Sequence, residues 1–597
     1  MSFLLYFVYW SYYSCPVYSL YSALAEVLYQ KMGKLKDAEL PLSQRCCTLS
    51  ISHGKDGTES TCCGLLIDTR HGIILTHASL LSQMLTSNSA VLRDLKEEYF
   101  SQSKQLSRFE VEVLFQKTQV ENLEENELSQ PLNNKLAPNF LNSELKSSPG
   151  FVIHNASVQC IFQCWSLRQV LSKLLPAGSW DFVENLTDVD QGNEKREKRN
   201  QNSPEYYSLL PCFLLLKIRN WKPFESVLDV RLSVNNQQGD RVEIQSTPFG
   251  SVSPEIFFNC RSQGIISNLS GKNNILILTD ARCIPGAEGG ALYFCDGKHR
   301  VLMGIMIATL CWKNNEWVGL SLAASLSEIL DSLNDLPLKW SDDTYYSVNT
   351  HGSQWTMSKV IKSVQVNIPH ISVNGNWGSG ICVGHNKQGQ RVILTCSHVI
   401  GKGDPTSVEV LYKPVQTPYR ADVVYRVPMG QQFDLGILLE QKTSTSEPGI
   451  KVRRTGTLRQ GESVLVIGHA LFGRGFDLEP TVTKGIVSKV IRVRNQPVMI
   501  QTTCAVQAGA SGGAVVDMEG RLVGLVVCNA RDTSTGASYP HINMSVPIAT
   551  IIPVLDSYIE SGDKSVLRSL CVRNPVIHSL WTMEKFKQDP QVLTSKL

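Results

Sequence analysis

The sequence carries little excess charge of either sign. It has 57 Lys and Arg against 54 Asp and Glu among 597 residues, a formal net charge of +3. Proteins that bind nucleic acid or a membrane surface do so largely through concentrated positive charge. We therefore expect neither kind of partner.

Metal-ligand spacing is also missing. The pairs Cys46-Cys47 and Cys62-Cys63 and the scattered His residues do not follow the spacing of zinc sites, so we expect no metal and no organic cofactor. The 17 Cys are odd in number and form no disulfide framework. That pattern favours a reducing compartment, and a secreted protein with some bridges is the alternative.

Long amphipathic helical patterns are nearly absent. Short runs rich in Val, Ile and Leu instead end at Gly, Asn, Asp or Pro, which is typical of strands joined by tight turns. A chain of this length favours two to four folded units. We predict an all-β protein, and barrels suit so many short strands because they close the sheet edges.

The sequence contains an internal repeat. Blocks in the C-terminal half read WGSGICV, RVILTCSHVI, FDLGILLE, GESVLVIGHALFG, TKGIVSKV, QTTCAVQAGASGGAVVD and GRLVGLVV. Similar blocks in the N-terminal half follow the same order: CCGLLID, HGIILTHASLL, PCFLLLKI, GDRVEIQSTPFG, SQGIISNL, LTDARCIPGAEGGALYF and HRVLMGIMI. Such a repeat predicts two copies of one fold, with Ser511 falling where Glu288 stands.

The domain boundaries follow from this repeat. We predict a degenerate N-terminal domain over residues 32–333, a linker over 334–363, a C-terminal domain over 364–560 and a tail over 561–597. The N-terminal copy is the longer one because of a polar and charged insertion at about 83–206. We expect this insertion to form long surface loops with some disorder.

Three residues of the C-terminal copy have the order and the local contexts of a nucleophilic triad. Ser511 lies in the glycine-rich turn GASGG, His398 follows an apolar strand, and Asp434 begins another apolar strand. A buried carboxylate needs a partner, and a bond to the imidazole would fix the tautomer that accepts the serine proton. Each residue alone is more often a turn or core residue, so the prediction rests on the three together.

The same turn predicts an oxyanion hole and a specificity pocket. The N–H groups of Gly509 and Ser511 would converge on the developing oxyanion. Six positions before the nucleophile stands Ala505, which offers no counter-charge to a basic side chain. The facing wall would come from Val526, Val527 and Cys528, so we expect a small to medium apolar residue or Cys before the scissile bond.

The blocks SGICV, TCSHVI, FDLGILL, TKGIVS and GASGGAV resemble the trypsin-like proteases of the HtrA (Deg) group over about residues 365–555. The resemblance implies a chymotrypsin-like fold of two six-stranded barrels in each copy, with the catalytic residues in the cleft between barrels. After Ile551 too few residues remain for a PDZ domain, which departs from the HtrA pattern and makes the N-terminal copy the candidate for regulation.

The N-terminal copy looks inactive. It keeps His77 after an apolar strand, but Glu288 replaces the nucleophile and the block PCFLLLKI has no aspartate. Loss of the serine alone removes roughly a millionfold of rate in such triads. We therefore expect a docked pseudo-protease with a structural or regulatory role.

The two ends of the chain bear on its location. The last three residues, Ser595, Lys596 and Leu597, match the peroxisomal import address, which predicts binding to the import receptor and a place in the peroxisomal matrix. The apolar residues 1–31 lack a basic start and a clear cleavage site, so we expect no membrane span, and translation from Met32 is the alternative.

With this address and an inactive first copy, the chain resembles the peroxisomal processing peptidases of the HtrA group. The resemblance implies a serine endopeptidase that removes targeting leaders from imported matrix proteins, processes enzymes of fatty-acid β-oxidation and cleaves itself, with self-association also open. Two alternatives remain. One is a secreted or membrane-tethered HtrA-like protease, and the other is a binding scaffold in which both copies are inactive.

Overall fold

The computed structural model describes most of both copies. The described residues are 45–53, 58–85, 90–102, 104, 106–116, 151–175, 181–182, 204–223, 228–231, 236–250, 252–284, 286–295, 300–308, 311–313, 316–337, 346–349, 356–402, 408–413, 417–428, 431, 433–443, 448–473, 478–531, 538–571 and 574–583. All of them belong to one compact unit that spans residues 42–597. The apolar N-terminal segment, much of the polar insertion and the terminal Ser595-Lys596-Leu597 lie outside the described residues.

The first sheet of the N-terminal half closes into a barrel. Its strand order is β4-β6-β5-β1-β2-β3-β8, and β6 also pairs with β8, so six strands form a ring and β4 hangs on its edge. The strands are β1 (Cys46–His53), β2 (Thr58–Asp68), β3 (Ile73–His77), β4 (Phe100–Ser101), β5 (Glu110–Gln116), β6 (Phe151–Gln163) and β8 (Cys212–Ile218).

This barrel corrects the expected insertion. Strands β5 and β6 lie inside residues 83–206, which we predicted to be surface loops. In β5, Val111 and Val113 are fully buried while Glu110 and Gln116 are exposed. This alternation is typical of a half-buried strand, but the polar composition of the whole stretch obscured it.

The second sheet of the N-terminal half closes in the same way. Its order is β13-β10-β11-β12-β17-β14-β9-β18, and β13 also pairs with β14. The strands are β9 (Leu228–Arg231), β10 (Arg241–Ser246), β11 (Cys260–Ser270), β12 (Leu276–Thr279), β13 (Ala291–Cys295), β14 (Arg300–Ala308), β17 (Ser321–Ser325) and β18 (Tyr346–Asn349). The strand β18 falls within the expected linker and extends this sheet.

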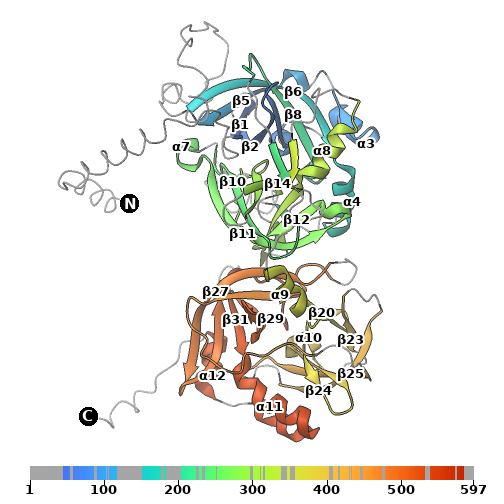
Figure 1. The fold of residues 1–597 in the computed structure, drawn as a ribbon, viewed down its shortest axis with the longest axis vertical. Coiled ribbons are helices and arrows are strands. Elements are labelled where there is room, and N and C mark those ends of the chain that lie inside the picture. The colour runs from blue at the N-terminus through green and yellow to red at the C-terminus, as the bar shows by residue number, and fades with distance from the viewer. Residues whose placement is uncertain are drawn as a thin grey trace, which may run out of the picture. The chain divides into compact units, whose positions relative to one another are not determined.

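The C-terminal half repeats the pair of barrels, drawn in yellow to red in Figure 1. The first has the order β20-β19-β23-β24-β25-β22-β21, where β20 and β21 are separated only by Gly380 and act as one strand that closes the ring. Its strands are β19 (His370–Val373), β20 (Asn376–Ser379), β21 (Ile381–His385), β22 (Gln390–Thr395), β23 (Val408–Leu411), β24 (Tyr419–Arg426) and β25 (Gly436–Thr443).

The last barrel has the order β28-β27-β26-β29-β30-β31 and closes through the β28–β31 pair. Its strands are β26 (Ser463–Gly468), β27 (Thr481–Val493), β28 (Gln496–Thr502), β29 (Ala514–Asp517), β30 (Leu522–Arg531) and β31 (Ser538–Pro547). Short strands of the N-terminal half continue this sheet beyond β31, namely β16 (Glu316–Trp317), β15 (Cys311–Lys313) and β7 (Asp181–Phe182). The four closed rings make the fold that of tandem chymotrypsin-like double barrels.

Helices connect or follow the strands. They are α3 (Ala90–Glu97), α4 (Trp165–Leu174), α6 (Pro204–Leu209), α7 (Pro254–Phe257), α8 (Leu326–Asn334), α9 (Thr356–Gln365), α10 (Ser397–Ile400), α11 (Ile548–Ser561) and α12 (Pro575–Thr582), with 3₁₀ turns η2 (Ala78–Leu81), η3 (Leu106–Arg108), η8 (Lys272–Asn274) and η9 (Lys564–Leu570). Leu567 and Leu570 of η9 are buried with the C-terminal core, so the predicted tail begins as part of that domain. Among the described helices, none combines the length and apolar composition needed to cross a bilayer.

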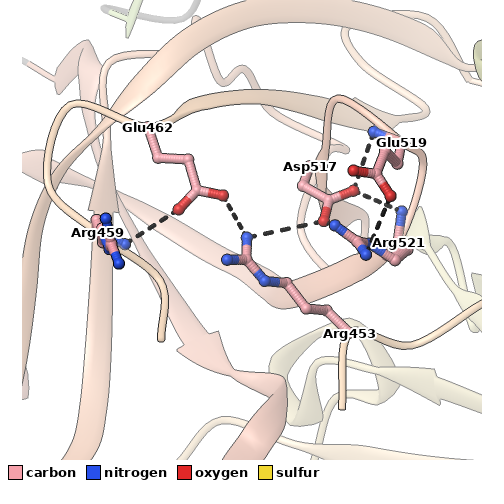
Figure 2. A network of polar contacts seen from close by, with 6 residues as sticks. All are labelled: Arg453, Arg459, Glu462, Asp517, Glu519 and Arg521. Atoms are coloured by element: carbon pink, nitrogen blue, oxygen red, sulfur yellow. Dashed lines mark hydrogen bonds and ion pairs between the residues drawn. The ribbon is translucent and has the colours of Figure 1, made fainter. Parts of the chain in front are cut away.

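A network of ion pairs ties the segment between the two C-terminal barrels to the last one (Figure 2). Arg453 contacts Glu462 and lies 3.7 Å from Asp517, and Arg521 pairs with Asp517 at 2.8 Å. The main chain follows the same route, since the Arg453 N–H donates to the Leu522 carbonyl at 3.1 Å. The segment that joins the two C-terminal barrels is thus fixed to the last one by backbone and side-chain bonds.

Candidate active site

His398 and Asp434 lie in contact at the ends of two paired strands. Thr395 at the end of β22 pairs with Gly436 at the start of β25, which brings the residues just beyond them together. His398 Nδ1 is hydrogen-bonded to one oxygen of Asp434, and the His398 main-chain N–H donates to the other at 3.0 Å. Because a carboxylate only accepts, Nδ1 carries the proton and Nε2 is left as the base.

Ser511 lies in a turn whose backbone requires glycine at positions 509 and 512. Gly509 and Gly512 have φ of +90° and +84°. A Cβ at Gly509 would lie 2.1 Å from the Trp377 ring, and one at Gly512 would lie 2.1 Å from the Ser379 carbonyl oxygen. Both the backbone conformation and the tight packing therefore require these glycines.

The Ser511 side chain does not yet face the base. Its hydroxyl donates to the Val527 carbonyl at 2.9 Å, and no bond with His398 is formed within the described residues. A rotation about the Cα–Cβ bond would be needed to redirect the oxygen. Catalytic hydrogen bonds often form only once substrate is present.

The turns that carry His398 and Ser511 meet at one carbonyl. Cys396 donates its thiol to the Val526 carbonyl at 3.2 Å, and the Gly512 N–H donates to the same oxygen at 2.8 Å. Burial is the main reason that the pKa of Cys396 is raised well above its usual value, so the thiol stays neutral. The turn that precedes His398 and the turn that carries Ser511 are therefore linked through the Val526 carbonyl.

Ser379 holds the serine turn from the opposite side, a role that the sequence did not reveal. Its hydroxyl donates to the Gly509 carbonyl and its N–H to the Ser511 carbonyl, each at 2.8 Å. The hydroxyl in turn accepts the His469 N–H at 2.8 Å. In the described part of the chain the N–H groups of Gly509 and Ser511 have no acceptor, so both can donate to a ligand.

The predicted pocket residues form two adjacent segments. Ala505 is 2% exposed, and its carbonyl accepts the Thr483 hydroxyl at 2.8 Å. The Asn529 side chain donates to the Val506 carbonyl at 2.8 Å and ties the two segments together. Val526 and Val527 are buried on β30, and beside them Cys528 is partly exposed. Burial, followed by the Asp434 charge, raises the pKa of Cys528 to about 11.

One set of donor atoms in the described residues has the spacing of a metal site, and it coincides with the predicted triad. Ligand atoms of Cys396, His398 and Asp434 lie within 4.8 Å of one another. The carboxylate is already bonded to the imidazole, and a neutral buried thiol is a poor ligand. We assign no metal to this set.

The N-terminal half repeats the bonding around Ser379 atom by atom. The Cys63 N–H donates to the Glu288 carbonyl at 2.8 Å, and its thiol donates to the Gly286 carbonyl at 3.4 Å. The Thr76 hydroxyl donates to the Cys63 carbonyl at 2.6 Å, as Thr395 does to Ser379 at 2.8 Å. Cys63 and Thr76 are therefore the counterparts of Ser379 and Thr395.

This register corrects the role expected for His77. Counting from Thr76, the counterpart of His398 is Ser79, and His77 matches Cys396. The sequence alone aligned LTH loosely with LTCSH. Burial lowers the pKa of His77 to about 4, and its Nε2 is bonded to the Leu210 carbonyl at 3.0 Å. His77 is thus a neutral core residue.

The other two triad positions are also lost in the N-terminal half. Thr76 pairs with Leu214 as Thr395 pairs with Gly436, which makes Cys212 the counterpart of Asp434. Glu288 accepts the Gly286 N–H at 3.0 Å with its own carboxylate. That N–H matches the Gly509 donor, so one half of the second oxyanion site is already occupied.

Known proteins resemble the chain at two levels. The family model for the trypsin-like peptidase domain matches residues 378–525, which include His398, Asp434 and Ser511. The peroxisomal leader peptide-processing protease of Mus musculus is 27% identical over 91% of this chain and 96% of its own length. The protein of that name from Homo sapiens is 32% identical over 58% of this chain and 60% of its own length. The serine protease Do-like HtrA of Lactobacillus helveticus is 29% identical over 31% of this chain and 43% of its own length.

Proposed function

We propose that this chain, a homologue of the peroxisomal leader peptide-processing proteases with a trypsin-like serine peptidase domain, cleaves leader peptides from imported peroxisomal matrix proteins. The observation that carries the catalytic part is the contact of His398 with Asp434 beside a serine turn with two free N–H donors. The proposal that leader peptides are the substrates is based on similarity to the Mus musculus and Homo sapiens proteins of that name.

In the proposed reaction Ser511 is the nucleophile. Its hydroxyl turns from the Val527 carbonyl to His398 Nε2, which takes the proton as the oxygen attacks the substrate carbonyl. Asp434 keeps the imidazole oriented and stabilises its positive charge. The developing oxyanion lies between the N–H groups of Gly509 and Ser511, each contributing about 3 kcal/mol to transition-state stabilisation. Protonated His398 then gives its proton to the leaving amine as the peptide C–N bond breaks, which leaves the acyl group on Ser511. Water, activated by the same histidine, attacks this ester and releases the acyl group, and the proton returns to Ser511.

The proposed pocket selects a small to medium apolar residue or Cys before the scissile bond. Ala505 provides an uncharged floor, and Val526, Val527 and Cys528 provide the facing wall. An Arg or Lys side chain would lose its hydration there without gaining a counter-charge.

Location and wider substrates complete the proposal. The terminal Ser595-Lys596-Leu597 would direct the chain to the peroxisomal matrix through the import receptor. Enzymes of fatty-acid β-oxidation would be further substrates. The chain would also cut itself within the polar insertion. Deleting the last three residues should leave the protein outside peroxisomes, whereas release on deleting residues 1–31 would favour the membrane-tethered alternative.

One experiment tests the central claim. Full-length wild type and Ser511→Ala are each incubated with a leader-bearing matrix protein, and all fragments are weighed by mass spectrometry. We expect leader release and self-cleavage only with wild type. Equal cleavage by Ser511→Ala would point to a contaminating protease, and an intact substrate with both would reject the proposal.

A further inference from the structure

The two halves share a sheet next to the predicted pocket. Strand β16 of the N-terminal half runs parallel to β31, with Glu316 paired to Ser538. Two residues further along β31, the Pro540 carbonyl accepts the Val506 N–H at 2.9 Å. The N-terminal half thus adds an edge to the strand that holds the pocket segment.

Beyond β16 the chain passes directly behind Ala505. Val318 and Leu320 are buried in the same apolar cluster as Val506. Between them, a Cβ built on Gly319 would lie 3.0 Å from the Ala505 Cβ and 3.1 Å from His541 Nε2. A glycine of the inactive half therefore lies in close contact with the predicted floor of the pocket.

A second contact is formed by polar side chains of the N-terminal half that bond to the start of β27, a strand that packs against β11. Buried Asp280 accepts the Ile265 N–H of its own half with one oxygen and the Lys484 N–H with the other, each at 2.7 Å. The Asn268 amide donates to the Glu479 carbonyl at 2.9 Å and to the Thr481 hydroxyl at 3.1 Å. The start of β27 is therefore held by carboxylate and amide groups of the other half.

Strand β27 also contacts the pocket segment that contains Ala505. Thr483, the neighbour of Lys484, donates its hydroxyl to the Ala505 carbonyl at 2.8 Å. A Cβ on Gly485 would lie 2.5 Å from the Cys504 nitrogen, so the two backbones are pressed together. A shift of β27 would therefore also displace residues 504–505, because the two segments are in close contact with no free space between them.

We propose that the inactive half is a positioning element for the pocket that receives the side chain before the scissile bond. Gly319 sets the depth of the floor, and Asn268 with Asp280 fixes the strand that carries it. This inference rests on the proposed function and assigns the second copy a role in selecting substrates with small to medium apolar side chains.

The test uses full-length protein and peptides that differ only in the residue before the cleaved bond: Ala, Cys, Leu and Phe. The variants are Gly319→Ala and Asn268→Ala. The matched control is Asn273→Ala, whose amide donates to Glu328 at 2.9 Å on the surface of the same half. For each protein we measure kcat and KM for every peptide, the thermal midpoint, and the labelling rate by a small fluorophosphonate.

The two variants should change selectivity in opposite directions. Gly319→Ala narrows the pocket, so kcat/KM for Leu and Phe should fall about tenfold relative to Ala. Asn268→Ala removes two bonds to the start of β27, so kcat/KM for Leu and Phe relative to Ala should rise. In both variants the labelling rate of Ser511 should stay within about twofold of wild type, because this probe does not need the pocket. The control Asn273→Ala should stay within about twofold of wild type as well. Should Asn268→Ala not fold, Gly319→Ala alone decides.

Unchanged ratios in folded, labelled variants would reject the positioning role and leave the peptidase intact. A uniform loss across all peptides would also reject it, since it would report damage to the triad. Wild type that neither labels nor cleaves any peptide would reject the proposed function and this inference together.

Discussion

The hydroxyl of Ser379 donates to the carbonyl of Gly509 at 2.8 Å. With its N–H on the Ser511 carbonyl, this residue fixes two of the three carbonyls in the serine turn, while the N–H groups of Gly509 and Ser511 have no acceptor among the described residues. The N-terminal half keeps the same arrangement with Cys63 in place of Ser379. The turn geometry is therefore a property of the duplicated fold, and it persists in the half where the triad residues are absent.

Replacing Ser379 should lower turnover more than substrate binding. In Ser379→Ala the Gly509 carbonyl loses its donor, so the N–H pair is less well placed for the oxyanion. We expect kcat to fall by about 10- to 100-fold with KM within about twofold, since loss of a whole oxyanion donor costs 10²–10³. Steady-state kinetics on one cleaved peptide give both values.

Ser379→Cys is the matched variant because Cys63 makes this bond through sulfur in the other half. It should recover much of the lost kcat. A peptide aldehyde, which forms the oxyanion, should bind more weakly to Ser379→Ala in the same proportion as kcat falls. Equal loss in both variants, or a rise in KM alone, would argue against an oxyanion role.

The local sequence was sufficient for the duplicated barrels and for the order of His398, Asp434 and Ser511. Short apolar runs and a glycine-rich turn determine their structure through backbone geometry that acts over a few residues. The role of Ser379 was not visible, because it depends on a bond to a residue 130 positions away. Its only sequence signal was the repeated block that contains it.

The misplacement of His77 has a similar cause. Apolar strands of the two halves match in composition, but strand register is fixed by hydrogen bonds, and a shift of two residues keeps the same faces buried. The strands β5 and β6 were missed because composition was averaged over a long polar segment. The contacts of Asp280 and Gly319 with the other half could not be predicted, since nothing local distinguishes them.

Restoring a serine should not reactivate the N-terminal half. In the double variant Glu288→Ser/Ser511→Ala, the new hydroxyl has Ser79 and Cys212 where a base and a carboxylate would be needed. We expect no labelling by a fluorophosphonate above the Ser511→Ala background. Wild type and Ser511→Ala bracket the assay, and labelling of the N-terminal half would show that a base lies closer than the register indicates.

Acid should destabilise the protein through His469. Burial, and then the nearby charge of His370, lower the pKa of His469 to about 3, and Lys413 acts in the same direction. The unfolded chain takes up this proton near pH 6.5 and the native state does not. Stability is therefore complete above pH 6.5 and falls by about 1.4 kcal/mol per pH unit below it, for this group.

His469→Gln should remove that dependence. Urea unfolding at intervals from pH 7.5 to 4.5 should give a slope about one proton smaller in the variant than in wild type. Part of the slope should remain, because His77 also has a lowered pKa. Identical slopes would mean that His469 is protonated in the folded protein or that the unfolded state keeps it buried.

Arg453 should contribute more to stability than its neighbour Arg521 (Figure 2). Its side chain is 14% exposed and lies between Glu462 and Asp517, of which Asp517 is 5% exposed. Burial alone would raise the pKa of Glu462, but the bond with Arg453 lowers it, so this carboxylate is ionised at neutral pH. Arg453→Ala would leave Glu462 without its cation and Asp517 with Arg521 alone, and should cost about 1–3 kcal/mol in urea unfolding. Arg521→Ala should cost less because that side chain is 38% exposed and screened by water.

Arg453→Lys should recover only part of the loss, since an ammonium cannot present the guanidinium's several donors to both acids. Equal losses for Arg453→Ala and Arg521→Ala would mean that the network is held mainly by the main-chain bonds at Leu522.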